Sequence, residues 1–145
     1  MNRKVRVLLG IAMMLGSFLL PGTKVHAFDG NDVLLQINCI REQNGLAPYE
    51  LSEDFCKCAE IRANEQAKSY SHIRPDGTKW YTVSPLVNRE NIAHLTCEKQ
   101  QQHIVDAWMQ SESHKRNVLS PNSKNVGIGI CETTDGECYI VMLTD

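Results

Sequence analysis

The chain has 145 residues, of which 17 are acidic and 15 basic. Four of the basic residues and none of the acidic ones precede Phe28, so residues 28–145 carry eleven basic against 17 acidic side chains, a formal net charge of −6. An acidic chain lacks the basic face that phosphate binding needs, which excludes nucleic acid as a partner and disfavours simple adhesion to anionic lipid or wall polymer. From Phe28 onward the chain is long enough for one domain with one core.

Residues 1–27 are typical of an export signal. Basic residues precede an apolar run at 7–20, and residues 25–27 fit the small-x-small pattern of a cleavage site. We therefore predict cleavage after Ala27, a secreted extracellular protein, a single domain over 28–145 and no transmembrane segment after cleavage. The alternative is an uncleaved anchor, although the run is shorter than the roughly 20 apolar residues that span a bilayer.

All six cysteines follow Ala27, which in an exported chain indicates disulfide bonds. Cys131 and Cys138 flank an expected four-residue hairpin loop at 133–136, which would place them opposite each other at the Cβ separation of a disulfide. We therefore expect a Cys131–Cys138 bridge. The other cysteines would form two more bridges in a pairing that the sequence leaves open: Cys39, Cys56, Cys58 and Cys97. Zinc or redox use is the weaker alternative, because Cys56-x-Cys58 is not a CxxC motif.

In the first half of the chain we expect two helices. One begins near Val33. The other runs from Ser52 to about Tyr70 and buries a stripe of alanines spaced by four residues, together with either Ile61 or Arg62. The small side chains of this stripe allow close approach to another element.

In the second half, composition and periodicity predict a turn, two helical segments and three strands. They are a turn at 74–77, a short strand at 79–83, a helix at 100–110, a helical turn at 113–119 and two β-rich runs at 126–130 and 138–143. Helices come first and a hairpin last. The fold class is therefore α+β, with helices packed over an antiparallel sheet.

Three polar residues in turn-rich segments are candidates for a site. His72 lies in SHIRPDG (71–77), Glu90 lies in RENIA (89–93), and His114 follows a predicted helix. Two imidazoles and a carboxylate can hold a divalent metal with open positions, and histidine can also relay a proton. The alternative is that the three side chains cap helix ends or hydrogen-bond turns.

Four segments, in this order, resemble the bacterial secreted branch of the CAP superfamily, named for cysteine-rich secretory proteins, antigen 5 and pathogenesis-related proteins (the SCP domain). They are INCIREQNGLAPY (37–49), SHIRPDG, RENIA and AWMQSESHKRNVLSPNSKNVGIGI (107–130). The resemblance runs from about Leu34 to Leu143. It implies a single-domain α-β-α sandwich with a central cleft of paired histidine and glutamate side chains.

The resemblance places His72, Glu90 and His114 in that cleft, where they would be the ligands of a zinc or magnesium ion. The family's second glutamate aligns with Ser111, and Glu112 is its neighbour. One residue turns a helical side chain by about 100°, so Glu112 is kept only as a further cleft candidate.

Arg89 stands where the family's glutamate motif usually begins with glycine. We expect the Arg89 guanidinium to be able to pair with a cleft carboxylate and so to compete with a metal.

Three functions are compatible with these features. We favour a secreted binding or interaction module, not an enzyme, whose extracellular ligand is a metal, lipid, peptide or wall component. The second is a metal-assisted hydrolase of extracellular peptide or cell-wall material, with His72 and His114 on the metal and Glu90 as third ligand or base. No nucleophile elbow supports catalysis by serine. The third is a structural component of the cell surface or of a spore.

Overall fold

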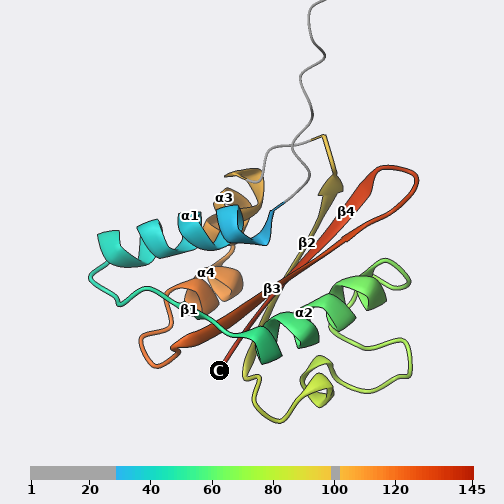
Figure 1. Ribbon diagram of the computed structural model, residues 1–145, viewed down its shortest axis with the longest axis horizontal. Helices are drawn as coiled ribbons and strands as arrows, with labels where there is room; N and C mark the ends of the chain where they lie inside the picture. Colours follow the sequence, from blue (N-terminus) through green and yellow to red (C-terminus); the bar gives the residue numbers. More distant parts are fainter. Residues whose placement is uncertain (1–28, 99–101) are drawn as a thin grey trace, which may run out of the picture.

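The computed structural model describes residues 29–98 and 102–145, so the predicted signal peptide lies outside the described residues. Helices α1, α3 and α4 cover one face of a sheet and α2 covers the other, which gives the α-β-α sandwich that the sequence predicted (Figure 1). The helices are α1 (Gly30–Gln43), α2 (Glu53–Gln66), α3 (Gln102–Gln110), α4 (Glu112–Val118) and the 3-10 helix η1 (Trp80–Val83). The strands are β1 (Glu50–Leu51), β2 (Arg89–Thr96), β3 (Asn125–Glu132) and β4 (Glu137–Thr144).

The sheet has the order β1-β3-β4-β2. The terminal hairpin β3–β4 and the pair β2–β4 are antiparallel, whereas the two-residue β1 runs parallel to β3 at one edge. The expected antiparallel sheet is therefore mixed at that edge. The predicted short strand at 79–83 is wrong, because residues Trp80–Val83 form the 3-10 helix. Strand β2 was not predicted.

The core consists of two apolar layers, one on each side of the sheet. In β4, Ile140 and Met142 pack with α1, α3 and α4, whereas Val141 and Leu143 pack with α2. All four side chains are fully buried. A central strand covered on both faces is apolar at successive positions, and this is the pattern of β4.

Close contact between α2 and β3 depends on two glycines. A Cβ added to Gly127 would lie 2.1 Å from the Phe55 carbonyl carbon, and one added to Gly129 would lie 2.1 Å from the Ala59 carbonyl carbon. Such distances are far inside van der Waals contact, so the helix backbone rests directly on the strand. The fully buried Ala59 confirms that the small-residue stripe of α2 allows this approach.

Each side of the core also holds a fully buried arginine. The Arg41 guanidinium lies 3.6 Å from the centroid of the Tyr49 ring and donates to the carbonyl oxygens of Val118 (2.8 Å) and Ser120 (3.0 Å), which ties α1 to the end of α4. On α2, the sequence left open whether Ile61 or Arg62 belongs to the buried stripe. Arg62 is the buried residue of the two.

The predicted Cys131–Cys138 disulfide is wrong. Cys138 is bonded to Cys97, with Cα atoms 5.1 Å apart. The hairpin register places Glu132 opposite Cys138 and Cys131 opposite Tyr139. Because successive strand residues face opposite sides, Cys131 packs with the α2 layer and Cys138 with the other layer.

The two further disulfides that we expected are absent from the described residues. The free thiols are those of Cys39, Cys56, Cys58 and Cys131.

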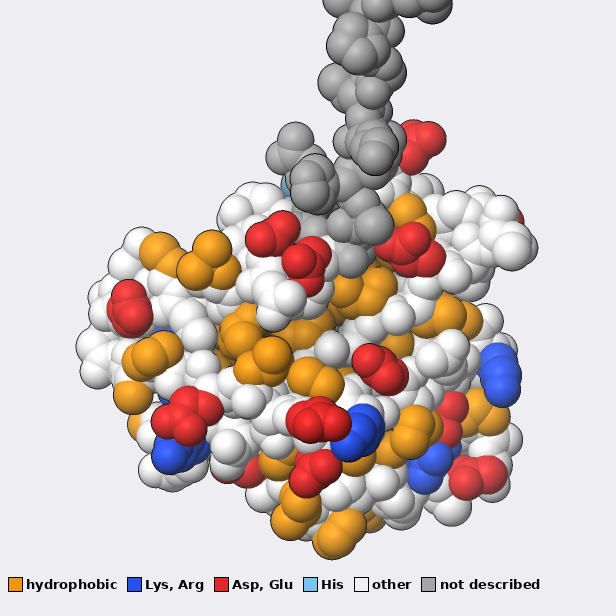
Figure 2. All heavy atoms as spheres, in the orientation of Figure 1, with side chains coloured by type: hydrophobic (Ala, Val, Ile, Leu, Met, Phe, Trp, Pro, Cys, Tyr) orange, Lys and Arg blue, Asp and Glu red, His pale blue; other side chains and the backbone are white. Residues whose placement is uncertain are grey.

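On the face seen in Figure 2, apolar side chains gather near the centre and charged side chains lie around them. None of the helices in residues 29–98 and 102–145 combines the length and the hydrophobicity of a transmembrane span.

Candidate functional site

His72 and Glu90 form the centre of the site. The His72 Nδ1 donates to Glu90 Oε1 over 2.8 Å. The Glu90 side chain is fully buried, whereas half of the His72 side chain is exposed. The buried carboxylate therefore fixes the tautomer and the direction of the imidazole, and it leaves Nε2 as the ring nitrogen for a ligand.

Arg62 is the site residue that the sequence analysis did not assign. Its Nε donates to Glu90 Oε2 (2.7 Å) and its Nη2 to Glu90 Oε1 (3.2 Å), a two-point contact between fully buried side chains. Burial lowers the pKa of the Arg62 guanidinium, but the hydrogen bonds and charges of Glu90 and Glu65 outweigh it and raise this pKa overall. Both carboxylate oxygens of Glu90 are thus engaged by an arginine that stays charged.

The segment that carries His72 is held by hydrogen bonds to the end of α2. Gln66 Oε1 accepts from the Ser71 backbone N–H (2.8 Å), and Gln66 Nε2 donates to the Ser71 carbonyl oxygen (2.7 Å). Arg74, on the far side of His72, pairs with Glu65 Oε1 through Nη2 at 2.7 Å. These contacts explain how a loop residue acquires a defined position.

His114 lies on α4, which is hydrogen-bonded to β2 at Glu90 and Asn91. Asn91 Nδ2 donates to the His114 carbonyl oxygen (3.1 Å). Asn117 Nδ2 donates to Asn91 Oδ1 (2.7 Å) and to the Glu90 carbonyl oxygen (3.2 Å). These hydrogen bonds from two side-chain amides connect α4 to β2. The pKa of the His114 imidazole is lowered, first by burial and then by the charge of His72.

The cleft candidate Glu112 and the neighbouring Arg89 line a surface cavity. Glu112 is exposed, and the lining of this cavity includes neither His72 nor His114. The expectation that Arg89 pairs with a cleft carboxylate is wrong, because Arg89 Nη1 donates to Ser123 Oγ (2.8 Å) and to the Asp145 main-chain oxygen. Arg62, approaching from α2, takes that role instead.

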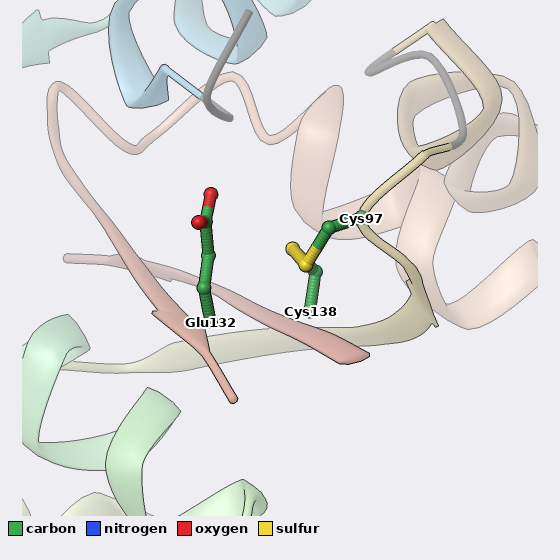
Figure 3. Close-up of side chains that lie close together, drawn as sticks. All are labelled: Cys97, Glu132 and Cys138. Carbon is green, nitrogen blue, oxygen red and sulfur yellow. A yellow bond between two sulfur atoms is a disulfide. The ribbon is translucent and has the colours of Figure 1, made fainter. Parts of the chain in front are cut away.

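Elsewhere in residues 29–98 and 102–145, three potential metal ligands lie close together. Cys97, Glu132 and Cys138 are the group that brings three potential ligand atoms within 4.8 Å of one another, and Figure 3 shows Glu132 projecting alongside the two cysteines. The two sulfurs are joined in a disulfide, so no thiolate is available there. Among residues 29–98 and 102–145, the set His72, Glu90 and His114 does not reach this spacing.

The α-β-α fold is that of a CAP, or SCP, domain. Residues 34–143 match the cysteine-rich secretory protein family, CAP. The chain therefore belongs to this family, as the four sequence segments predicted.

One relative is an uncharacterised protein, YkwD, of Bacillus subtilis. It is 33% identical over 119 residues, which are 77% of this chain and 45% of that protein. The chain thus spans less than half the length of the relative that it matches.

Solved structures share the fold. An outer surface protein of Borrelia burgdorferi superposes with a TM-score of 0.65 at 20% identity, over 82% of this chain and 96% of that one. An extracellular protein with an SCP domain from Bacillus anthracis gives a TM-score of 0.59 at 16% identity, over 78% of this chain and 40% of that one.

Proposed function

We propose that this protein is a secreted CAP-domain binding module whose ligand is held at the imidazoles of His72 and His114. One observation carries the proposal: the Glu90 carboxylate is fully buried, with both oxygens hydrogen-bonded, one to Arg62 and the other to both Arg62 and His72. A group in this state orients its neighbours and is not free to react.

The same contacts disfavour hydrolysis. A general base must reach the proton that it removes, either directly or through one water molecule. The Glu90 oxygens instead face a guanidinium and an imidazole nitrogen, and Glu112 lines a different cavity. Glu90 and Glu112 are therefore not reacting groups, and the imidazoles of His72 and His114 contact the ligand.

The residues fit a zinc ion better than magnesium. A histidine that binds zinc commonly donates its other ring N–H to a carboxylate, and His72 does so to Glu90. His72 and His114 would hold the zinc ion, which would supply a Lewis-acidic anchor for an anionic or carbonyl group of the ligand. Magnesium requires oxygen ligands, and the engaged Glu90 does not supply them.

We also propose that the protein acts outside the cell. The support is the export signal predicted in residues 1–27, together with the outer-surface and extracellular descriptions of the two structural neighbours above. On this proposal the organic ligand is a lipid, peptide or wall component.

Calorimetric titration of the secreted protein with zinc chloride tests the site. We expect one zinc ion per chain, loss of binding in His72→Ala and in His114→Ala, and no heat with magnesium chloride. His103→Ala, at an exposed position of α3, is the matched control and should bind zinc normally.

Absence of zinc heat in the unmodified protein would contradict the metal part of the proposal. Zinc-dependent turnover of peptides or peptidoglycan, lost in the same two variants, would replace the binding module with a hydrolase.

A further inference from the structure

A surface cavity of about 490 Å³ lies beside α4. Its charged lining residues are Arg89, Glu112, Lys115 and Arg116, and Leu119 and Pro121 contribute apolar surface. The volume is within the range of about 300–1,000 Å³ that is typical of small-molecule sites. Neither the family resemblance nor the proposed ligand site at His72 and His114 accounts for this cavity.

The cavity differs from the rest of the protein in charge. Three cations and one carboxylate line it, whereas residues 28–145 as a whole carry a net charge of −6. Within the described part of the chain, no ion pair within 4.0 Å is formed by Glu112, Lys115 or Arg116. Lys115 and Arg116 thus bring positive charge to the cavity that no carboxylate of the described residues pairs with.

One of the cations is held in place. Arg89 Nη1 donates to Ser123 Oγ at 2.8 Å and to the Asp145 main-chain oxygen, and the residue is only partly exposed. A guanidinium with a fixed direction loses little conformational entropy when it binds an anion, and its planar fork suits a carboxylate or a phosphate. Arg116 supplies a second guanidinium to the same cavity.

We propose that this cavity binds the oxyanion group, carboxylate or phosphate, of a small organic molecule whose apolar part rests on Leu119 and Pro121. Arg89 and Arg116 contact the oxyanion, and Lys115 adds positive charge. Glu112 repels a second negative charge, so the site favours singly charged or zwitterionic molecules over polyanions. This binding does not involve His72 or His114.

The test is an NMR titration of the ¹⁵N-labelled secreted protein with two singly charged anions, benzoate and methyl phenyl phosphate, using neutral benzyl alcohol as the matched probe. We expect saturable shifts of the amides at 115–119 and 89 with at least one of the two anions, and none with the alcohol. The anion that binds more tightly identifies the oxyanion class. No saturable shift with either anion, or equal binding of the alcohol, would overturn the proposal.

Substitutions test whether the anion binds at this cavity. Arg116→Gln should weaken it by about tenfold or more, the scale of one charge-assisted hydrogen bond, and Lys115→Gln should weaken it by less. Glu112→Gln should tighten it, and His72→Ala should leave it unchanged. Lys57→Gln, an exposed cation on α2, controls for general loss of positive charge.

If Lys57→Gln weakened binding as much as Arg116→Gln, the anions would be following overall charge and the proposal would be wrong. Normal binding by both Arg116→Gln and Lys115→Gln would also overturn it. Dispersed amide spectra of each variant establish that it is folded.

Discussion

Arg62 and Glu90 are 28 residues apart in the chain and meet as a fully buried, two-point ion pair, with nitrogen–oxygen distances of 2.7 and 3.2 Å. The pair joins α2 to β2 and holds the carboxylate that orients His72. A buried pair of this kind is sensitive to loss of one partner, because the other charge is then left in the core without compensation.

Replacing Arg62 with methionine should therefore lower the free energy of unfolding by about 3–5 kcal/mol, as measured by urea denaturation. The double variant Arg62→Met/Glu90→Leu should recover a large part of the loss, because no charge is left buried. Lys57→Met, which removes the exposed pair with Glu53, is the control and should change the free energy of unfolding little. Equal losses in the two single variants would contradict the buried ion pair.

The Cys97–Cys138 disulfide closes a loop with a sequence separation of 41 residues. The chain-entropy relation gives a stabilisation of about 4 kcal/mol for a loop of this length, so Cys97→Ser should be less stable by roughly 2–4 kcal/mol in urea denaturation. Cys39→Ser, at an exposed position, should change little.

Peptide mapping after alkylation without reduction checks the pairing itself. Cys97 and Cys138 should be recovered in one linked pair of peptides, with Cys131 alkylated. A linked Cys131–Cys138 peptide would show that the hairpin register is different.

Gly129→Ala should be strongly destabilising, because its Cβ would lie 2.1 Å from the Ala59 carbonyl carbon. The α2 backbone would have to shift to relieve this clash, which costs free energy. We expect a loss of at least about 3 kcal/mol in unfolding free energy, on the scale of severe overpacking. Gly30→Ala is the matched change, since its Cβ would meet Ile128 side-chain atoms at 3.3 Å. Similar stability of the two variants would contradict direct contact between α2 and β3.

His114 should titrate below the ordinary histidine range in the EDTA-treated protein, because burial first and the His72 charge second lower its pKa. Its imidazole signals, followed by NMR against pH, measure this. His72→Gln should raise the pKa of His114 part of the way back, and His94→Gln should leave it unchanged. A rise of equal size in both variants would mean that the effect is not that of the neighbouring imidazole.

The lowered pKa of His114 also fixes the direction of a stability change. Between this pKa and the ordinary value of about 6.5, the unfolded chain binds more protons than the folded chain. The stabilisation from His114 is therefore complete above about pH 6.5 and is lost as the pH falls through the folded-state pKa. Urea denaturation of wild type and His114→Gln at several pH values should show this difference.

Strand β2 shows why part of the fold could not be predicted. Glu90 and Asn91 are polar but buried, and each is satisfied by a distant partner, Arg62 and Asn117 respectively. Buried polar residues remove the apolar alternation by which a strand is recognised in a sequence. The segment was therefore recognised by its resemblance to a family motif and not as a strand.

The α+β class, the family and the buried stripe of α2 could be predicted from the sequence, because periodicity and local motifs indicate them. The sequence did not indicate which partners meet: Arg62 and not Arg89 contacts Glu90, and Cys97 and not Cys131 is bonded to Cys138. The physical reason is register. A shift of one residue in a hairpin reverses the face of every side chain, and the direction in which α2 crosses the sheet selects which cation reaches the carboxylate.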